Sequence, residues 1–214
     1  TQASLASNSD CFVALNRRCY SSTMQALEVL ENDSSSRVIN IYDQQDMEVA
    51  RSIGHPETIV QNWMYANSIH LVDFINVFGR GEVAKVEIMS PWVQDCPSNV
   101  IAVIYFDGGD IAIYQANWTG PGPWSVSVST AAQRLELRPL ENLSIQMRGS
   151  RSVTAQEISS ADVEFKPGLL MQAKILVDGI RGTKINLPTL QDANRSMKLV
   201  EQIYGLAAES GNLE

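Results

Sequence analysis

The chain has 214 residues, of which 44% are hydrophobic and 19% charged, a composition typical of a globular protein rather than a disordered one. Its formal net charge is −8, from 16 basic and 24 acidic residues, and no basic cluster interrupts it. A nucleic-acid-binding surface is therefore not expected. No apolar run is long enough to span a bilayer and no signal-peptide pattern appears, so no membrane association is predicted.

The three cysteines suggest a cellular compartment but no metal site. Cys11, Cys19 and Cys96 are odd in number and lack the spacing of metal ligands, so no metal site is predicted. Reduced thiols suit a reducing environment, and we therefore expect a cytoplasmic protein.

The first apolar segment, residues 11–15, is continuous rather than alternating. Such a run is typical of a strand covered on both faces. Because a covered strand needs neighbours on each side, we expect the chain to start partway through a larger α/β unit. The predicted domains are a remnant of that unit at residues 1–20 and an α/β domain at residues 21–214.

The next signals are local. Ser22 with Gln25 matches a capping box and predicts a helix over residues 22–32. Residues 37–42 alternate as a strand, and residues 43–57 are polar and irregular.

A long helix is predicted over residues 63–78 from apolar residues at helical spacing. Within it Asn67, His70 and Asp73 lie three residues apart, and therefore along one edge. His70 is one of two histidines, and imidazole is the only side chain that titrates near neutral pH without perturbation. Two interpretations stay open: a core histidine hydrogen-bonded to Asp73, and a residue with a mechanistic role.

Short strands dominate the second half of the chain. Residues 100–106 and 111–118 flank Asp-Gly-Gly-Asp, a strong hairpin signal. Further strands are predicted over residues 83–88, 125–130, 134–137, 143–147 and 152–158. Consecutive strands without helices between them predict an antiparallel meander with one face packed and the other free for a partner.

Two helices close the chain, at residues 168–180 and 189–208, the second capped by Thr189 with Asp192. The predicted fold class is α+β: a large, mainly antiparallel, open-faced sheet with helices on one face.

Four groups of motifs, in chain order, carry a resemblance to a known family. Residues 12–18 (FVALNRR) match a strand that ends in an Asn/Arg-rich turn, and residues 67–73 (NSIHLVD) match a G-x-H-x-x-D helix. Sheet and closing-helix motifs follow at residues 106–109, 116–118, 135–141, 187–193 and 199–204. Together they resemble the C-terminal portion of the Gfo/Idh/MocA oxidoreductases, preceded by a remnant of their Rossmann-type dinucleotide-binding domain.

The resemblance implies an enzyme that moves hydride between NAD or NADP and a hydroxyl-bearing carbon of a sugar, nucleotide-sugar or cyclitol. His70 matches the family's acid–base histidine, and Asn16 in the Asn/Arg turn is the expected cofactor contact. The residues expected to bind substrate are Arg17, Tyr65, Asn67 and Trp118. Structural alternatives stay open for these four: a solvated arginine, an edge aromatic, a helix-capping asparagine and a sheet-packing tryptophan.

The chain also departs from the family pattern. It has no G-x-G-x-x-G loop to hold a pyrophosphate, so this chain alone is not expected to bind NAD or NADP. The family's Glu-Lys-Pro motif would precede residue 1. Residues 164–167 (EFKP) mimic it in letters but follow the sheet, so we set them aside. Ala66 stands where many members carry an aspartate one turn before the histidine.

Two functional hypotheses follow. In the first, the chain is the substrate-binding and oligomerisation portion of an NAD(P)-dependent oxidoreductase. It is expected to be inactive as a fragment and to form a dimer or tetramer through the free sheet face. In the second, it is a non-catalytic sheet domain that serves oligomerisation or partner binding.

Overall fold

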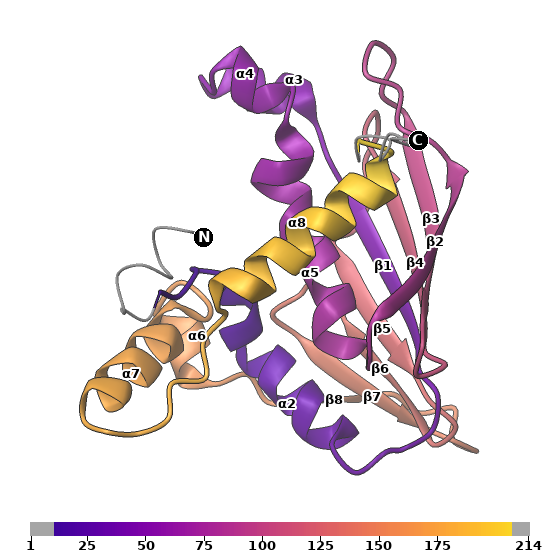
Figure 1. Cartoon of the computed structure of the whole chain (residues 1–214). Coiled ribbons are helices and arrows are strands. Elements are labelled where there is room, and N and C mark those ends of the chain that lie inside the picture. The colour runs from indigo at the N-terminus through magenta and orange to yellow at the C-terminus, as the bar shows by residue number, and fades with distance from the viewer. Residues whose placement is uncertain (1–10, 207–214) are drawn as a thin grey trace, which may run out of the picture.

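The computed structural model describes residues 11–206, which form one α+β unit (Figure 1). Its single sheet has eight strands in the order β2-β3-β4-β1-β5-β6-β7-β8. The strands are β1 Val38–Gln44, β2 Val83–Ser90, β3 Asn99–Phe106, β4 Ile111–Asn117, β5 Ser125–Ser129, β6 Gln133–Leu137, β7 Leu143–Met147 and β8 Thr154–Ala155. All neighbours are antiparallel except β1 and β4, which pair in parallel.

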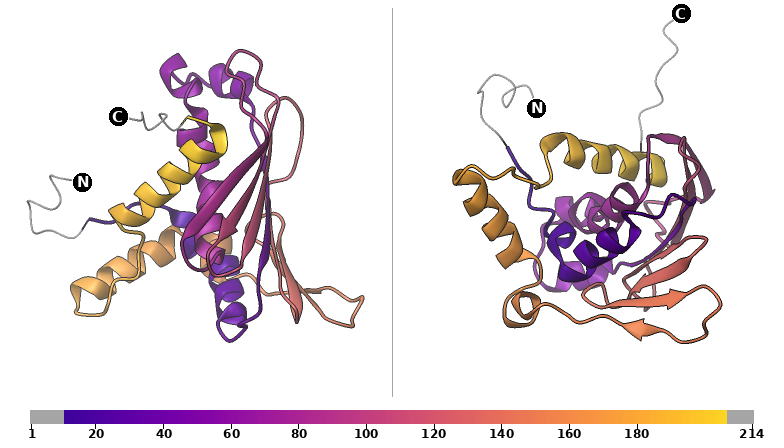
Figure 2. Two further views of the ribbon diagram at one scale, coloured as in Figure 1. Left: turned by 45° about the vertical axis from the view of Figure 1, so that its right-hand side comes forward. Right: turned by 90° about the horizontal axis from the view of Figure 1, so that it is seen from below.

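Helices precede, interrupt and follow the strands. They are η1 Asn16–Cys19, α2 Ser21–Leu30, α3 Met47–Ser52, α4 Glu57–Val60, η2 Met64–Ser68, α5 Ile69–Phe78, α6 Ser160–Glu164, α7 Leu169–Ile180 and α8 Leu190–Tyr204. The main helices α2, α5 and α8 all contact one face of the sheet, and the other face is open (Figures 1 and 2). The predicted fold class, an open-faced sheet with helices on one face, is confirmed.

The core lies between these helices and the inner face of the sheet. In β3 and β4 every second side chain is buried, so the inner residues join the same core as the buried residues of α5 and α8 while their neighbours point outward. No helix among residues 11–206 is long and apolar enough to cross a membrane.

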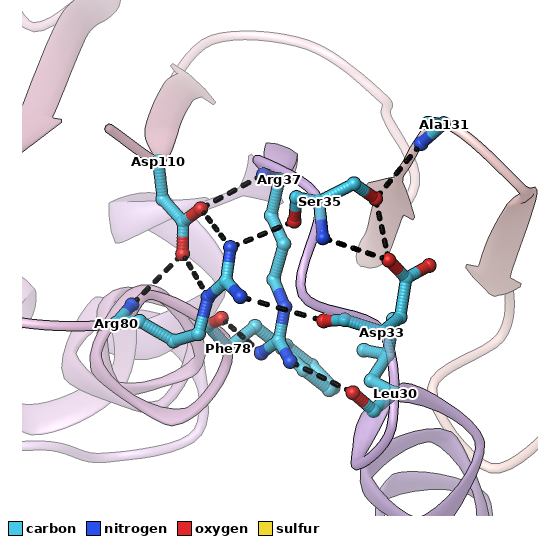
Figure 3. Close-up of polar contacts among 8 residues, drawn as sticks. All are labelled: Leu30, Asp33, Ser35, Arg37, Phe78, Arg80, Asp110 and Ala131. Atoms are coloured by element: carbon cyan, nitrogen blue, oxygen red, sulfur yellow. Dashed lines mark hydrogen bonds and ion pairs between the residues drawn. The ribbon is translucent and has the colours of Figure 1, made fainter. Parts of the chain in front are cut away.

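An ion-pair junction joins the ends of two helices to the sheet (Figure 3). The fully buried carboxylate of Asp110 accepts hydrogen bonds from the guanidinium of Arg80 at 2.7 and 2.9 Å and from the backbone N–H of Arg37 at 2.8 Å. The guanidinium of Arg37 donates to the carbonyls of Leu30 and Phe78, the last residues of α2 and α5. Arg37 therefore satisfies carbonyls that a helix end leaves without partners.

Several local predictions are confirmed. The Asp-Gly-Gly-Asp turn joins antiparallel β3 and β4, with Gly109 at a φ of 85° that favours glycine. Thr189 and Asp192 form the capping box that opens α8. The predicted end of this helix at residue 208 lies outside the described residues.

Other local predictions are wrong. Residues 11–15 form no doubly covered strand: only one bridge is made, between Phe12 and Thr189, and Cys11 is exposed. The Ser22–Gln25 capping box is absent, because Ser22 donates to the carbonyl of Leu140 instead.

Two segments also differ in extent from their predictions. The stretch 43–57, predicted as irregular, contains α3, whose N-cap Asp46 accepts from two backbone N–H groups. The last strand is only two residues long, and the short helix α6 follows it.

Candidate functional site

The helix that carries His70 begins with a wide turn. Met64–Ser68 (η2) is π-helical and continues directly into α5, so the predicted single helix over 63–78 has two geometries. Such π turns are often found at functional sites, because they change which direction the following side chains take.

The buried side chain of Gln45 holds the π turn by hydrogen bonds. Gln45, directly after β1, accepts hydrogen bonds at its Oε1 from Trp63 Nε1 and Asn67 Nδ2, both at 2.9 Å. Its own amide nitrogen donates to the carboxylate of Asp43. Asn67 is therefore directed into this network, and its predicted role in substrate binding stays a prediction.

The network continues through two tyrosines. Asp43 accepts from the hydroxyl of Tyr114 at 2.7 Å; that hydroxyl lies 2.8 Å from the hydroxyl of Tyr204, which donates to Ser68 at 3.2 Å. Burial raises the pKa of Asp43 to about 6 and raises the pKa values of Tyr114 and Tyr204 above their ordinary value. The β1 strand, the π turn and α8 are thus linked by buried hydrogen bonds.

Asp73 is held by partners other than the histidine. Its carboxylate forms a two-pronged ion pair with Arg18, both contacts at 2.8 Å, and accepts from Ser196 Oγ of α8 at 2.6 Å. The interpretation of His70 as a core histidine paired with Asp73 is therefore wrong.

His70 lies half-buried at the second position of α5. Its Nδ1 is buried and has no hydrogen-bond partner among the described residues. The pKa of His70 is lowered to about 4, chiefly by burial and also by the positive charges of Arg17 and Lys166, while Asp73 acts in the opposite direction. At neutral pH the ring is uncharged, and a neutral imidazole can accept a proton from a ligand.

The Asn/Arg turn packs against α5, the helix that carries His70. Residues Asn16–Cys19 form a 3₁₀ turn (η1), and the charge of Arg17 acts on His70. Asn16 Nδ2 donates to the carbonyl of Pro167 at 3.1 Å, and this contact brings Lys166 to the turn. The ion pair of Arg18 with Asp73 thus places η1 against the helix that carries His70.

The other two predicted substrate-binding residues are aromatic. Tyr65 is close enough to Glu201 of α8 for that charge to raise its pKa, together with burial. Trp118 is 3% exposed and packs against Trp92 and Tyr204. Trp118 also lines a cavity of about 970 Å³ between α3, α4 and the loop before β3, whose lining residues do not include His70.

Sequence reasoning missed some residues around His70. Lys166 lies in the sequence EFKP, which resembles the family's Glu-Lys-Pro motif. This match was rejected because it follows the sheet instead of preceding residue 1. Gln45 and Asp43 both lie in the stretch 43–57 that was interpreted as irregular, and nothing local indicates that they meet the π turn. Trp124, whose ring lies 5.0 Å from the guanidinium of Arg17, follows a Gly-Pro-Gly-Pro turn without any pattern of its own.

The described residues do not fit a dinucleotide. The glycine-containing turn at residues 120–123 joins strand β4 to strand β5 rather than a strand to a helix, so no helix N-terminus faces it. Asn16, the expected cofactor contact, donates its amide to Pro167.

Neither a family model nor a curated protein matches the sequence. Solved structures do match. UDP-N-acetylglucosamine 3-dehydrogenase GnnA from Acidithiobacillus ferrooxidans is 12% identical, with a TM-score of 0.74, and the match covers 94% of this chain and 63% of that one. A dehydrogenase from Chromobacterium violaceum is 17% identical, with a TM-score of 0.72, over 96% of this chain and 63% of that one.

A third match is the WlbA dehydrogenase from Bordetella pertussis, solved in complex with NADH and UDP-GlcNAcA. It is 13% identical, with a TM-score of 0.68, over 95% of this chain and 63% of that one. This chain has the fold of these dehydrogenases. It spans about 63% of their length, and the fold expected from the Gfo/Idh/MocA resemblance is confirmed.

Proposed function

We propose that this chain is the substrate-binding and oligomerisation portion of a cytoplasmic NAD(P)-dependent oxidoreductase. The reaction transfers hydride to or from a hydroxyl-bearing carbon of a sugar, nucleotide-sugar or cyclitol. The observation that carries the proposal is His70: a neutral imidazole with an unpartnered buried nitrogen, in a fold shared with nucleotide-sugar dehydrogenases.

The chain's own part in this chemistry is proton handling and positioning. His70 accepts the hydroxyl proton of the substrate as the carbon is oxidised, or returns it in the reverse direction. Gln45 and the ion pair of Asp73 with Arg18 hold the two ends of the helical segment that presents the imidazole. NAD or NADP supplies the hydride acceptor, and residues outside this chain hold it.

Oligomerisation is assigned to the open sheet face. The outward residues of β1, β3 and β4 form an apolar surface that no element between residues 11 and 206 covers. They include Val38, Tyr42, Ile101, Val103 and Ile113. Large apolar sheet surfaces are usually covered by a partner, and a second copy is the simplest one.

The coding sequence upstream of Thr1 gives the first test. A G-x-G-x-x-G loop and a Glu-Lys-Pro motif in the same reading frame support the proposal, and a stop codon there contradicts it. Calorimetry gives a second test: the chain as given should bind no NADH, and micromolar binding would contradict the absence of a dinucleotide site.

The catalytic role is tested in the protein that carries both portions. His70→Ala should lower kcat by about 10²–10⁴-fold with little change in KM, because proton transfer is lost while substrate contacts remain. His55→Ala is the matched control, since His55 is the only other histidine and lies beside Trp63 before α4. An unchanged kcat for His70→Ala would return the histidine to a structural role.

The second candidate function is a non-catalytic sheet domain for oligomerisation or partner binding, and the apolar outer face of the sheet favours it. Self-association in solution, with no effect of added nucleotide-sugars on the nuclear magnetic resonance signals of the His70 ring, would favour this function over the first.

A further inference from the structure

Four buried residues form a line of hydrogen bonds from β1 to the last residue of the π turn. The carboxylate of Asp43 accepts from the hydroxyl of Tyr114 in β4 at 2.7 Å, and the hydroxyl oxygens of Tyr114 and Tyr204 lie 2.8 Å apart. The hydroxyl of Tyr204 in α8 lies 3.2 Å from Ser68 Oγ. All four residues are at most 2% exposed, so their polar groups depend on one another for hydrogen bonds. We call these four residues the buried relay.

The side chain of Gln45 determines which oxygen of Asp43 can carry a proton. Trp63 Nε1 can only donate, so the Gln45 atom that it contacts at 2.9 Å is the amide oxygen. The amide nitrogen of Gln45 therefore faces Asp43 Oδ1 and donates to it in either protonation state of the carboxyl group. A proton bound by Asp43 must then lie on Oδ2, the atom that contacts Tyr114.

The number of hydroxyl hydrogens in the buried relay permits two arrangements. Each hydroxyl has a single hydrogen to donate. If Tyr114 donates to Asp43 while Tyr204 donates to Ser68, no hydrogen lies between the two tyrosine oxygens, although they are only 2.8 Å apart. One end of the relay must therefore reverse.

The two arrangements differ by one proton at Asp43. When the carboxyl group is ionised, every hydroxyl donates toward Asp43, and Ser68 donates to Tyr204. When Oδ2 is protonated, every donor points away from Asp43, and the hydroxyl hydrogen of Ser68 is released from the relay. Both arrangements place one hydrogen in each of the three contacts.

Asp43 is the group in the buried relay that changes its charge near neutral pH. Its pKa is raised to about 6, chiefly by burial, against the opposing effects of Tyr114, Ser68 and Gln45 and of the positive charge of Arg17 in η1. Burial raises the pKa values of both relay tyrosines above their ordinary value, so these hydroxyls keep their hydrogens.

We infer that Asp43 is a positioning residue for His70: one proton at its Oδ2 reverses the hydrogen bonds of the buried relay and changes the π turn at Ser68. The proton comes from solvent, and the three hydroxyls rotate without losing their hydrogens. The consequence for catalysis rests on the proposed function, whereas the reversal of the relay does not.

The π turn is sensitive to the hydroxyl of Ser68. The carbonyl of Met64 accepts from the backbone N–H of Ile69, five residues later, and this bond is the one that makes the turn π-helical. A serine hydroxyl released inside a helix can donate to the carbonyl four residues earlier and bend the helix. For Ser68 that carbonyl belongs to Met64. Because His70 follows directly after this segment, a change in the turn moves the imidazole.

A nuclear magnetic resonance titration of the chain between pH 5 and 8 tests the inference. The carboxyl carbon of Asp43 reports its ionisation, the backbone N–H of Ser68 reports the end of the relay, and the His70 ring reports its position. All three signals should change with one midpoint of about 6. The pKa of His70 itself is about 4, below this range, so its response would come from movement of the ring.

Variants that each remove one polar group locate the path. Asp43→Asn should abolish the transition at Ser68 and at His70. Tyr204→Phe leaves Tyr114 bound to Asp43, so Asp43 should still titrate at about 6 while Ser68 no longer follows it.

Two further tyrosine variants complete the set. Tyr114→Phe removes a hydrogen bond that lowers the pKa of Asp43, so the midpoint of Asp43 should rise and the response of Ser68 should again be lost. Tyr105→Phe is the matched control, because it removes a hydroxyl on β3 that contacts Glu87 and lies outside the relay. It should leave all three signals unchanged, and circular dichroism reports whether each variant is folded.

Each contrary result overturns a stated part of the inference. A transition at Ser68 that persists in Asp43→Asn comes from another group, and one that persists in Tyr204→Phe comes directly from the charge of Asp43; either result overturns the relay. A His70 ring with no transition at a midpoint of about 6 overturns the positioning role. These results leave the proposed function standing, because the titration uses no substrate.

The catalytic consequence is measured in the protein that carries both portions. Its kcat should show a transition with a midpoint of about 6, and Asp43→Asn should remove that transition. An active enzyme without the transition contradicts the positioning role. A wild-type protein that oxidises no sugar, nucleotide-sugar or cyclitol contradicts the proposed function and leaves the reversal of the relay intact.

Discussion

Two buried titrating groups near the site should make opposite contributions to stability in the same pH range. The pKa of Asp43 is raised from 3.8 to about 6, and the pKa of His70 is lowered from 6.5 to about 4. The stability from protonated Asp43 is complete below pH 3.8 and is lost as pH rises through about 6. The stability from neutral His70 is complete above pH 6.5 and is lost as pH falls through about 4.

The stability contributions of Asp43 and His70 are similar in magnitude. At 1.36 kcal/mol per pKa unit, a shift of about 2 gives Asp43 a contribution of about 3 kcal/mol. The shift at His70 gives at most about 3 kcal/mol, and solvent reaching the exposed part of the ring reduces it. The two contributions therefore largely cancel in the wild-type chain between pH 4 and 7.

Single substitutions expose each contribution. Asp43→Asn removes the acid-stabilising group, so its free energy of unfolding should fall by about 2–3 kcal/mol more than that of the wild type from pH 7 to 4. His70→Gln should change in the opposite direction over the same range. Asp43→Asn also leaves a polar mismatch with Gln45 or Tyr114, which costs about 1–3 kcal/mol at every pH. The informative quantity is therefore the pH slope relative to the wild type.

Urea unfolding followed by tryptophan fluorescence at several pH values measures these slopes. Comparison with the wild type cancels the other carboxylates, which titrate alike in all three proteins. Variants with the wild-type slope, or with both slopes changed in the same direction, would refute the assignment of these pKa shifts to burial.

Two further predictions concern stability and assembly. Asp110→Ala should lower the free energy of unfolding by about 1–3 kcal/mol, because it removes the acceptor of the Arg80 guanidinium and of the backbone N–H groups of Arg37 and Arg80. Glu82→Gln at an exposed ion pair with Arg195 should change it by less than about 1 kcal/mol. Urea unfolding measures both, and equal losses would contradict the reasoning. Val103→Glu on the outer sheet face should convert an oligomer to a monomer in light scattering. Lys85→Glu on β2 should not have this effect. A monomeric wild-type protein would refute the proposed assembly.

Local sequence signals predicted an element well where all the residues that form it are close together in the sequence. The β3–β4 hairpin needs only its own glycine turn, and the α8 capping box needs only Thr189 and Asp192. The Ser22–Gln25 pattern failed because a distant carbonyl, that of Leu140, offered Ser22 a better partner. A local motif therefore predicts correctly only when no tertiary contact competes for its side chains.

Long-range placement was beyond local patterns. Strand β1 pairs in parallel with β4 and antiparallel with β5, and its register brings Asp43 opposite Ala116. That pairing positions Asp43 and Gln45 beneath the π turn, although more than 15 residues separate Gln45 from Trp63. The α6–α7 link, residues 165–168, lies against η1 through the contacts of Pro167 and Gly168 with Asn16, which no spacing in the sequence indicates.

The structure separates residues that the sequence places together. On a regular helix Asn67, His70 and Asp73 share one edge, but Asn67 is bound by Gln45 and Asp73 by Arg18, so His70 alone keeps an unpartnered nitrogen. The same division runs through the adjacent arginines, because Arg18 is paired and Arg17 is not. Structural contacts satisfy Asn67, Asp73 and Arg18, and they leave one member of each set with an unpartnered nitrogen. Since unpaired buried polar atoms are costly, the unpartnered nitrogen of His70 favours a ligand there over a purely structural role.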